Sequence, residues 1–574
     1  MESLRIHYNR SRSEHRAAVR PGAGWAAFCV RRVHDRPLNW TGARVARIAF
    51  RQPNLDTATP MFTDSTTPRA AATRLFMAAI ALYSLIVWPI IRADRFYIDD
   101  LGRSLSGYLG WARDGRPLAN VLMESLSLGY PLTDIAPIPQ VLCLLLLAYV
   151  AVMIGRRFSL DGLWRAPLVA LPIAANPFYL ENLSYKFDSV TMTAAVVFAV
   201  AAAVAIPTRG WRLALGALAL IASLCLYQAA IDIFLIFALV EAIWGMKTFE
   251  LPGRLLKRLL GRGVQAVAAL AIYQKIAAMT VQGDYASSHA GMVSLADAPA
   301  AILLNLQHYW EFVLGTITSI WGTLLLITIA LGLLASVAIA VRYLRAQWSS
   351  MSAGTRVACV VAAVLLPLAL VVAPWGPLLL LKAPVFAPRV MLGFGALVSA
   401  SLLLLLGLLM LVNASRRWQI AMLAIPAYGL ILLAVAYGNS LTLQKDYEAR
   451  VAESLSDDLA EMEAARGITQ YTLRGNVGRP PVLEHNIRKF ALLRALVPIH
   501  LTEAWGWAGV LLKHYGVDLP YVVPPYEAAL TVDFCALPRT IVRRNYQIAQ
   551  VGTTAVVIFR RSDCSRLVKA ASPR

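Results

Sequence analysis

The sequence has few charged residues and few cysteines for its length. Asp, Glu, Lys and Arg make up 15% of the 574 residues, hydrophobic residues make up 58%, and six residues are cysteine. No cluster of histidine and cysteine has the spacing of a metal centre, and no glycine-rich loop has the pattern that binds nucleotide phosphates. These absences argue against a domain built around such a metal or a nucleotide, and they leave hydrophobicity as the dominant signal.

Long apolar runs fill the middle of the chain, and the mean hydropathy is +0.58. Runs of about 20 apolar residues are long enough to cross a bilayer as helices. We therefore expect an α-helical polytopic membrane protein with about eleven transmembrane helices. The third predicted span carries Pro167, Pro172 and Pro177, which indicates a broken or re-entrant helix. The predicted spans are residues 74–91, 137–154, 166–180, 189–206, 213–227, 229–245, 264–281, 312–341, 357–381, 389–412 and 418–437.

The net charge of +21 would suit a nucleic-acid partner, but its distribution indicates a membrane protein without one. With the spans above, five basic loops lie on the same side as the basic N-terminus, and the positive-inside rule makes that side cytoplasmic. Acidic residues concentrate on the opposite side, where the C-terminal tail also lies. The basic loops contain Arg156, Arg157 and Arg165; Arg209 and Arg212; Lys247, Arg254, Lys257, Arg258 and Arg262; Arg342, Arg345 and Arg356; and Arg416 and Arg417.

Composition divides the chain into three regions. Residues 1–72 are rich in arginine and lack helical or strand periodicity. They are either a disordered cytoplasmic arm or the result of a start codon assigned too early, and Met61 would be a natural start. Residues 73–440 form the predicted transmembrane domain, and residues 441–574 are long enough for a small extracytoplasmic α+β domain.

The C-terminal region begins with apolar residues at near-helical spacing, which predicts an amphipathic helix. Strand-like segments follow at Gln470–Leu473 and Ala555–Phe559. The region also holds Cys535 and Cys564, the only two cysteines on the predicted outer side. A cysteine pair in an oxidising compartment is a candidate disulfide, so we predict one between them.

The most polar segment of the chain, residues 94–124, directly follows the first apolar span. It contains the adjacent acids Asp99 and Asp100, with Arg103 and Arg116 beside them. Carboxylates at the end of a transmembrane helix are costly to hold near lipid, which favours a functional site. An aspartate pair can act as a general base or bind Mg²⁺ or Mn²⁺, and arginines can neutralise phosphate. The alternative is a hydrated loop in which these acids and arginines only pair with each other.

A second polar island, residues 176–189, lies on the same predicted side. Its aromatic rings interleave with amide, acid and lysine groups, a combination that suits a sugar, whereas an interfacial aromatic belt would explain the rings alone. Tyr227 and Gln228 lie at the outer end of another span, and Lys382 and Arg389 form a plausible clamp for a lipid phosphate. As a single residue, each is better explained as an anchor at the membrane surface, and only their position on one side favours a site.

These segments, in this order, resemble the GtrII-like glucosyltransferases, bacterial inner-membrane proteins that modify O-antigen and related surface glycans. The most specific parts are Asp-Asp-x-x-Arg at residues 99–103 and Glu-Asn-Leu-Ser-Tyr-Lys-Phe-Asp at residues 181–188. The resemblance covers roughly residues 74–440; the tail resembles the family only in position.

The resemblance implies a GT-C-type fold and transfer of a hexose, glucose in the first instance, from a polyprenyl-phosphate donor to a glycan acceptor on the periplasmic face. A separate synthase and flippase would supply such a donor. An attacking sugar hydroxyl must lose a proton, which makes Asp99 or Asp100 the candidate catalytic base, and the departing phosphate develops charge. The expected phosphate-binding residues are Arg103, Arg116, Lys186 and Arg389. The expected sugar- or acceptor-binding residues are Trp111, Glu181, Asn182, Tyr185, Asp188, Tyr227 and Gln228.

Two other classes share this topology. A flippase or transporter of lipid-linked sugars predicts charges buried mid-span, paired broken helices and internal repeats, whereas these spans are nearly free of charge and no repeat is evident. An O-antigen polymerase or acyl-modifying enzyme would differ in the donor that it consumes. The sequence names neither the sugar nor the acceptor.

Overall fold

The computed structural model describes residues 68–282, 291–294, 296–523 and 535–559. These residues all belong to one unit of the chain, Thr66–Arg574. Most of the predicted N-terminal region 1–72 lies outside the described residues, and so does Cys564. The predictions for that region and for the Cys535–Cys564 disulfide therefore stay predictions.

Seven helices in the described part of the chain are long and apolar enough to cross a membrane. They give the protein the long apolar helices expected of a polytopic membrane protein, whereas the number of eleven spans stays a prediction. The seven are built from α1 (Pro68–Ala93), α4 (Ile138–Arg157), η3 (Gln228–Ala230) with α9 (Ile231–Lys247), α13 (Ser319–Gln347) with η4 (Trp348–Ser350), α14 (Ala353–Val372) with η5 (Ala373–Leu380), α15 (Leu392–Leu411) and α16 (Arg416–Arg466).

The other predicted spans correspond to helices that are shorter or more polar than these seven. The predicted break in the third span is confirmed, because α5 ends at Ala174 and the short α6 follows after Pro177. The predicted span 312–341 is interrupted, because α12 ends at Thr316 and α13 does not begin until Ser319. The carbonyl oxygen of Ile317 lies so close to Gly322 that any side chain at residue 322 would collide with it. These helices are α5 (Arg165–Ala174), α6 (Leu180–Ser184), α7 (Ser189–Val200) with η2 (Ala201–Ala205), α8 (Trp211–Leu226), α10 (Pro252–Thr280) and α12 (Ala298–Thr316).

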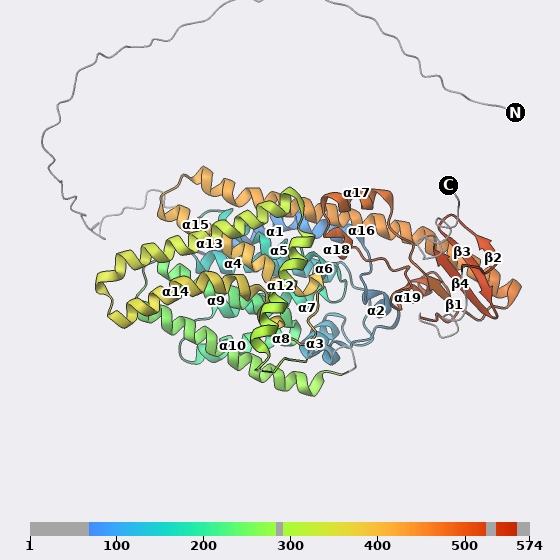
Figure 1. Cartoon of the computed structure of the whole chain (residues 1–574), viewed down its shortest axis with the longest axis horizontal. Helices are drawn as coiled ribbons and strands as arrows, with labels where there is room; N and C mark the ends of the chain where they lie inside the picture. The colour runs from blue at the N-terminus through green and yellow to red at the C-terminus, as the bar shows by residue number, and fades with distance from the viewer. Residues whose placement is uncertain (1–67, 283–290, 295, 524–534, 560–574) are drawn as a thin grey trace, which may run out of the picture. The chain divides into compact units, whose positions relative to one another are not determined.

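Helix α15 packs against α5, α9 and α13 and is drawn beside α13 in Figure 1. It carries no charged residue, and nearly all of its first sixteen side chains are buried. Gly395 lets α15 approach α5 closely, because a Cβ there would lie 2.3 Å from the carbonyl oxygen of Pro172. The break after α5 and the start of α15 therefore meet in the protein interior, where the second polar island begins.

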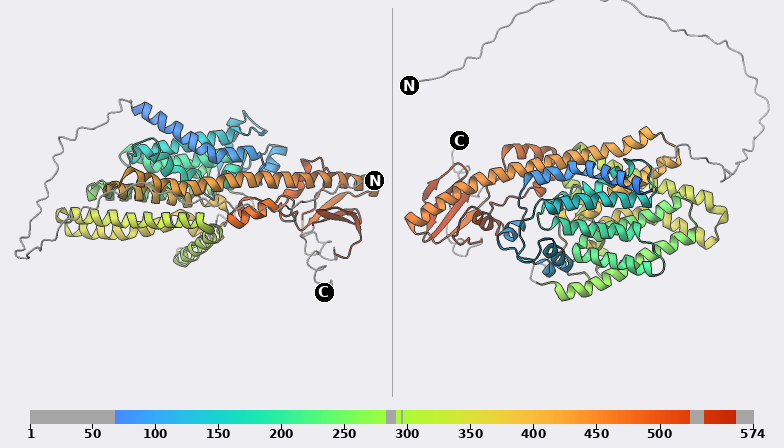
Figure 2. Two further views of the ribbon diagram at one scale, coloured as in Figure 1. Left: turned by 90° about the horizontal axis from the view of Figure 1, so that it is seen from above. Right: turned by 180° about the vertical axis from the view of Figure 1, so that it is seen from behind.

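Helix α16 is continuous over 51 residues and joins the apolar bundle to the C-terminal sheet (Figure 2). Its apolar half packs against α1 and α13, whereas its polar half buries Val451, Leu455 and Leu459 against the sheet. This confirms the predicted amphipathic helix. The predicted domain boundary at residue 440 falls inside this helix rather than in a linker.

The C-terminal sheet has four strands in the order β1-β4-β3-β2. The strands are β1 (Gln470–Arg474), β2 (Arg539–Val542), β3 (Tyr546–Val551) and β4 (Thr554–Phe559). Strands β1 and β4, the two predicted from sequence, pair in parallel with Gln470 opposite Thr554; β3 is antiparallel to both β4 and β2. Between β1 and β2 lie α17 (Pro481–Lys489), α18 (Leu493–Leu496) and α19 (Trp507–Lys513).

Candidate functional site

The adjacent acids Asp99 and Asp100 lie where the chain reverses direction after α1. The reversal uses left-handed backbone at Asp94 (φ 43°) and Ile98 (φ 48°), and it leads into the seven-residue helix α2 (Asp100–Ser106). Helix α2 ends at Gly107 (φ 62°), where any side chain would strike the backbone of Leu132. The two carboxylates therefore start a short helix that is held between the bundle and the following loop.

The carboxylate of Asp100 is completely buried and is bonded only to backbone N–H groups. Its Oδ2 accepts hydrogen bonds from Tyr97 N (3.0 Å) and Lys186 N (2.8 Å), and its Oδ1 accepts one from Phe187 N (3.3 Å). Burial raises the pKa of Asp100 to about 8, against the backbone donors that lower it. Asp100 thus ties the segment that precedes Asp188 to the start of α2, and neither of its oxygens is free for a metal ion or a substrate.

Asp99 has the opposite environment, because its side chain is exposed and makes no hydrogen bond that the structure defines in the described part of the chain. Protein atoms nevertheless displace much of the surrounding water, which raises the pKa of Asp99, and the nearby Asp188 raises it further. Three arginines lower it: Arg103, Arg389 and Arg116, in order of effect. Of the two acids, Asp99 is the one that a substrate can reach.

Asp188 and Arg103 form a buried ion pair beside Asp99. Arg103 Nη1 lies 3.3 Å from Asp188 Oδ2, and both side chains are at most 5% exposed. The Arg103 guanidinium also stacks over Trp111, 4.0 Å from the centre of a ring. The second oxygen of Asp188 is buried without a hydrogen-bond partner. A buried acceptor of this kind is costly unless something bonds to it, so Asp188 presents unused bonding capacity to the site.

Arg116 enters the site from the start of α3 (Pro117–Leu126), directly after the turn η1 (Trp111–Asp114). It pairs with the half-exposed Asp114 at 3.0 Å, and its guanidinium lies 5.7 Å from the ring centre of Tyr227. Burial opposes the charge of Arg116, but Asp188 and Asp114 outweigh that effect, so the net pKa of Arg116 is raised. Arg116 therefore remains a cation close to Asp188.

Arg389 is held by three residues that the sequence predicted to bind sugar. Glu181 accepts hydrogen bonds from the backbone N of Arg389 (3.0 Å) and from its Nη1 (3.1 Å). Asn182 Nδ2 and the hydroxyl of Tyr227 both donate to the carbonyl of Arg389, which lies in the turn η6 (Pro388–Val390). These contacts fix Arg389, whose charge lowers the pKa of Asp99, and they use much of the bonding capacity that would otherwise be available to a sugar.

Lys186 lies in a different cluster from the arginines. Its Nζ is 2.6 Å from Asp94 and 3.0 Å from Asp134, and it lies over the ring of Phe96. Two carboxylates neutralise this lysine, and it does not rank among the main electrostatic influences on Asp99. The structure thus separates Lys186 from the other predicted phosphate-binding residues.

The remaining predicted residues line or support the same end of the bundle. Tyr185 is buried edge-on against Tyr97, and Gln228 donates hydrogen bonds to the carbonyl of Asp114 and to the hydroxyl of Tyr273. The indole N–H of Trp111 is buried without a partner. In the parts of the chain that the structure describes, no group of three or more His, Cys, Asp or Glu side chains could hold a metal ion. The pair Asp99–Asp100 also fits a metal poorly, because the Asp100 carboxylate is completely buried and already accepts three backbone hydrogen bonds.

A contact that the sequence did not reveal fastens the C-terminal region to this site. Arg95 forms a buried salt bridge of 2.6 Å with Glu448 of α16 and donates to the carbonyl of Pro498. Glu448 also accepts the backbone N–H groups of His500 and Leu501. One signal in the sequence could have indicated this contact. Glu448 lies three residues before Val451, on the apolar face of α16, and a buried acid needs a partner there.

Comparisons with known proteins agree with the resemblance seen in the motifs. The family described as Glucosyl transferase GtrII matches residues 89–400, which contain every site residue named above except Glu448, His500, Leu501 and Pro498 of the C-terminal contact. A relative in Salmonella phage P22, described as an uncharacterized 55.3 kDa protein in the gtrB 5′ region, is 26% identical over 492 residues, covering 85% of this chain and 98% of its own length. No solved structure matches the chain. Because the family match covers more than half of the chain, the protein belongs to the GtrII glucosyl transferase family.

Proposed function

We propose that this protein is an integral-membrane glucosyltransferase of the GT-C type. It transfers glucose from a polyprenyl-phosphate donor to a cell-surface glycan such as O-antigen on the periplasmic side of the inner membrane. The observation that carries the proposal is the arrangement around Asp99, an exposed carboxylate flanked by Arg103, Arg116 and Arg389. This arrangement lies within the segment that matches a glucosyltransferase family.

In the proposed reaction, Asp99 is the general base. An acceptor hydroxyl attacks the anomeric carbon, its proton passes to the Asp99 carboxylate, and the bond from that carbon to the phosphate oxygen breaks. The leaving lipid phosphate gains negative charge, which Arg116 and Arg389 stabilise. No metal ion is needed for this balance of charge.

The remaining residues position these groups. Asp188 orients Arg103, while Glu181, Asn182 and Tyr227 fix Arg389. Lys186 is left out of the proposed phosphate site because Asp94 and Asp134 already neutralise it. Asp100 is a positioning residue, since it bonds only to backbone.

The experiment is an assay of the purified protein in detergent with radiolabelled donors: polyprenyl-phosphate glucose, other polyprenyl-phosphate hexoses and UDP-glucose. We expect transfer to a glycan acceptor from the polyprenyl-phosphate sugar and none from UDP-glucose. Transfer from UDP-glucose alone would contradict the donor. Movement of the lipid-linked sugar across proteoliposomes without transfer would instead favour the flippase alternative.

The periplasmic assignment needs a separate measurement. Cysteines introduced at the exposed Ser106 of α2 and at the exposed Arg417 of the opposite end should differ in labelling by a membrane-impermeant reagent in intact cells. We expect labelling at position 106 and protection at position 417, because the basic loops lie on the cytoplasmic side. The reverse result would place the site in the cytoplasm.

A further inference from the structure

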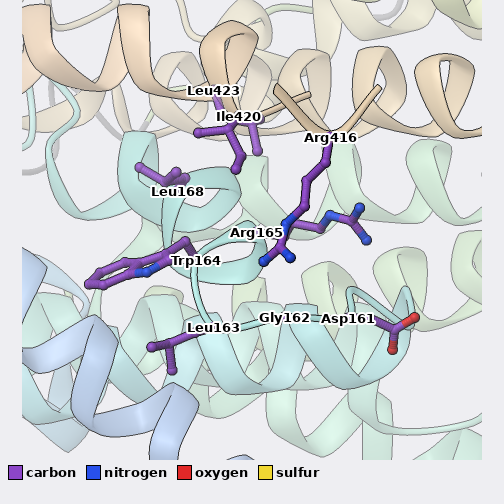
Figure 3. A pocket seen from close by; sticks show the side chains of 9 residues that line it. All are labelled: Asp161, Gly162, Leu163, Trp164, Arg165, Leu168, Arg416, Ile420 and Leu423. Carbon is purple, nitrogen blue, oxygen red and sulfur yellow. The ribbon is translucent and has the colours of Figure 1, made fainter. Parts of the chain in front are cut away.

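A small pocket lies at the other end of the bundle, between the N-terminal ends of α5 and α16. Its volume is about 200 Å³, and its lining includes Trp164, Arg165, Leu168, Arg416, Ile420 and Leu423 (Figure 3). Arg165 and Arg416 both belong to the basic loops that predict the cytoplasmic side. The pocket is thus separate from the proposed glucosyltransferase site in position and in composition.

The two arginines bring two positive charges into this pocket. Arg165 Nη2 donates to the amide oxygen of Gln419 at 2.6 Å, a neutral partner. Neither guanidinium lies within 4.0 Å of a carboxylate in the described ranges, although Asp161 also lines the pocket. Helices α5 and α16 both begin here, and their N-terminal ends add partial positive charge. The pocket is therefore complementary to an anion.

The other walls of the pocket are apolar and lie where a membrane surface is expected. Leu168, Ile420 and Leu423 continue along α5 and α16 into the apolar bundle, and the exposed indoles of Trp164 and Trp418 flank this level. Tryptophan is typical of the interface between lipid and water. Anchoring alone would explain the tryptophans and one outward-pointing arginine. It does not explain why two arginines from distant segments line one recess.

We propose that this pocket binds the anionic headgroup of a phospholipid, such as phosphatidylglycerol, from the leaflet on the basic side of the protein. The lipid phosphate lies between Arg165 and Arg416, where a guanidinium can form paired hydrogen bonds with phosphate oxygens. Its acyl chains follow Leu168, Ile420 and Leu423. The bound lipid bridges α5 and the first turn of α16.

The test measures binding of water-soluble, short-chain phosphatidylglycerol to the purified full-length protein. Parallel titrations use short-chain phosphatidylcholine, glycerol phosphate and inorganic phosphate. We expect Arg416→Gln to weaken phosphatidylglycerol binding about fivefold and Arg165→Gln/Arg416→Gln about twentyfold, since each basic residue near a membrane surface contributes a factor of that order. Arg417→Gln is the matched control, because it removes the same charge from the adjacent residue, which does not line the pocket, and it should weaken binding less than Arg416→Gln does.

The outcomes separate the possible occupants. Equal binding of phosphatidylcholine, or equal weakening by Arg417→Gln and Arg416→Gln, would overturn the proposal. Glycerol phosphate or inorganic phosphate binding as tightly as the lipid would show that the pocket takes a free phosphate compound instead. If the double variant fails to fold, the single variant Arg416→Gln decides the question, because its exposed side chain makes no hydrogen bond that the structure defines in the described ranges.

Discussion

Two clusters of partly buried charge, around Glu241 and around Asp99, use the same residue types in different ways. In the first, Glu241 accepts hydrogen bonds from Arg157 (2.6 and 3.0 Å) and from Arg262 (3.0 Å). Arg258 lies 3.9 Å away. Both carboxylate oxygens are thus fully engaged. In the second, the side chain of Asp99 makes no defined hydrogen bond among the described residues, and one oxygen of Asp188 is unbonded.

We interpret this difference as one between a structural role for the Glu241 cluster and the proposed catalytic role for the Asp99 cluster. Helix α9 begins at Ile231, close to the contact of Gln228 with Asp114 beside the Asp99 site, and it carries Glu241 about 15 Å further along its axis. The saturated cluster links α4, α9 and α10, so its charges have no capacity left for a ligand. The unsaturated cluster retains bonding capacity on exposed and buried carboxylates. We therefore expect substitutions in the first to affect stability and substitutions in the second to affect catalysis.

The largest expected effect is that of Asp99→Asn on transfer. Loss of the general base should lower kcat by about 10² to 10⁴-fold, while the thermal midpoint stays unchanged because the side chain is exposed and unbonded. Steady-state assays and thermal unfolding of the same preparation check both parts. Glu124→Gln, at an exposed acid of α3, is the control and should retain wild-type activity. Wild-type turnover in Asp99→Asn would remove Asp99 from the mechanism.

Glu241→Gln should have the inverse signature. It leaves Arg262 and Arg157 without their shared carboxylate, and removal of one partner from a buried ion pair costs about 3 kcal/mol or more. We expect a lower midpoint in thermal or denaturant unfolding and an unchanged kcat per folded molecule. A large fall in kcat at full stability would mean that the two clusters are coupled, contrary to the comparison.

Asp100→Asn should fall between these two cases. The Asn side chain would place its NH₂ group opposite a backbone N–H donor that needs an acceptor. Leaving that donor unbonded costs about 1–3 kcal/mol of stability. Activity should also fall, because Lys186 and Phe187 precede Asp188 directly. The measurement is the midpoint of unfolding together with kcat for Asp99→Asn and Asp100→Asn. Only the latter should lower both, and equal midpoints for the two variants would contradict the positioning role.

The smallest expected effect concerns pH. The pKa of Asp99 is raised by loss of surrounding water and by Asp188, and a general base must be deprotonated to act. Activity should therefore fall, as the pH is lowered, at a higher pH than the range of about 4 that is usual for an aspartate. Arg116→Gln removes a charge that lowers this pKa, so it should move the acid limb of the kcat/KM profile upward by up to about one pH unit. A downward shift would show that Arg116 does not act on Asp99.

Much of the site could be predicted from the sequence because its motifs are local. Asp99, Arg103 and Arg116 lie within one polar segment, and the predicted spans put Asp188 and Arg389 on the same predicted side of the membrane. The break at Pro177 and the strands at both ends of the C-terminal region also followed from local rules.

The rest depends on contacts between distant segments. The different environments of Asp99 and Asp100 arise because the backbone of Lys186 and Phe187, more than 80 residues away, bonds to only one of them. The neutralisation of Lys186 also depends on distant segments, because its partners Asp94 and Asp134 lie on two separate loops. Sequence spacing could not show that Glu181, Asn182 and Tyr227 all bond to Arg389, because Arg389 lies more than 160 residues after each of them.

The unbroken helix α16 has a mechanical consequence for the C-terminal region. A continuous helix does not bend freely between its two contacts. The number of residues from Gly438, which contacts Pro89, to Glu448 therefore sets how the sheet is rotated about the helix axis relative to the bundle. Adding one residue there would turn everything beyond it by about 100° and advance it by about 1.5 Å, which would carry Glu448 away from Arg95. Adding seven would nearly restore the direction but move the sheet outward by about 10 Å. The length of this segment therefore fixes the position of Glu448 relative to Arg95, and a change in it would disturb the loop that carries Arg95 and Asp99.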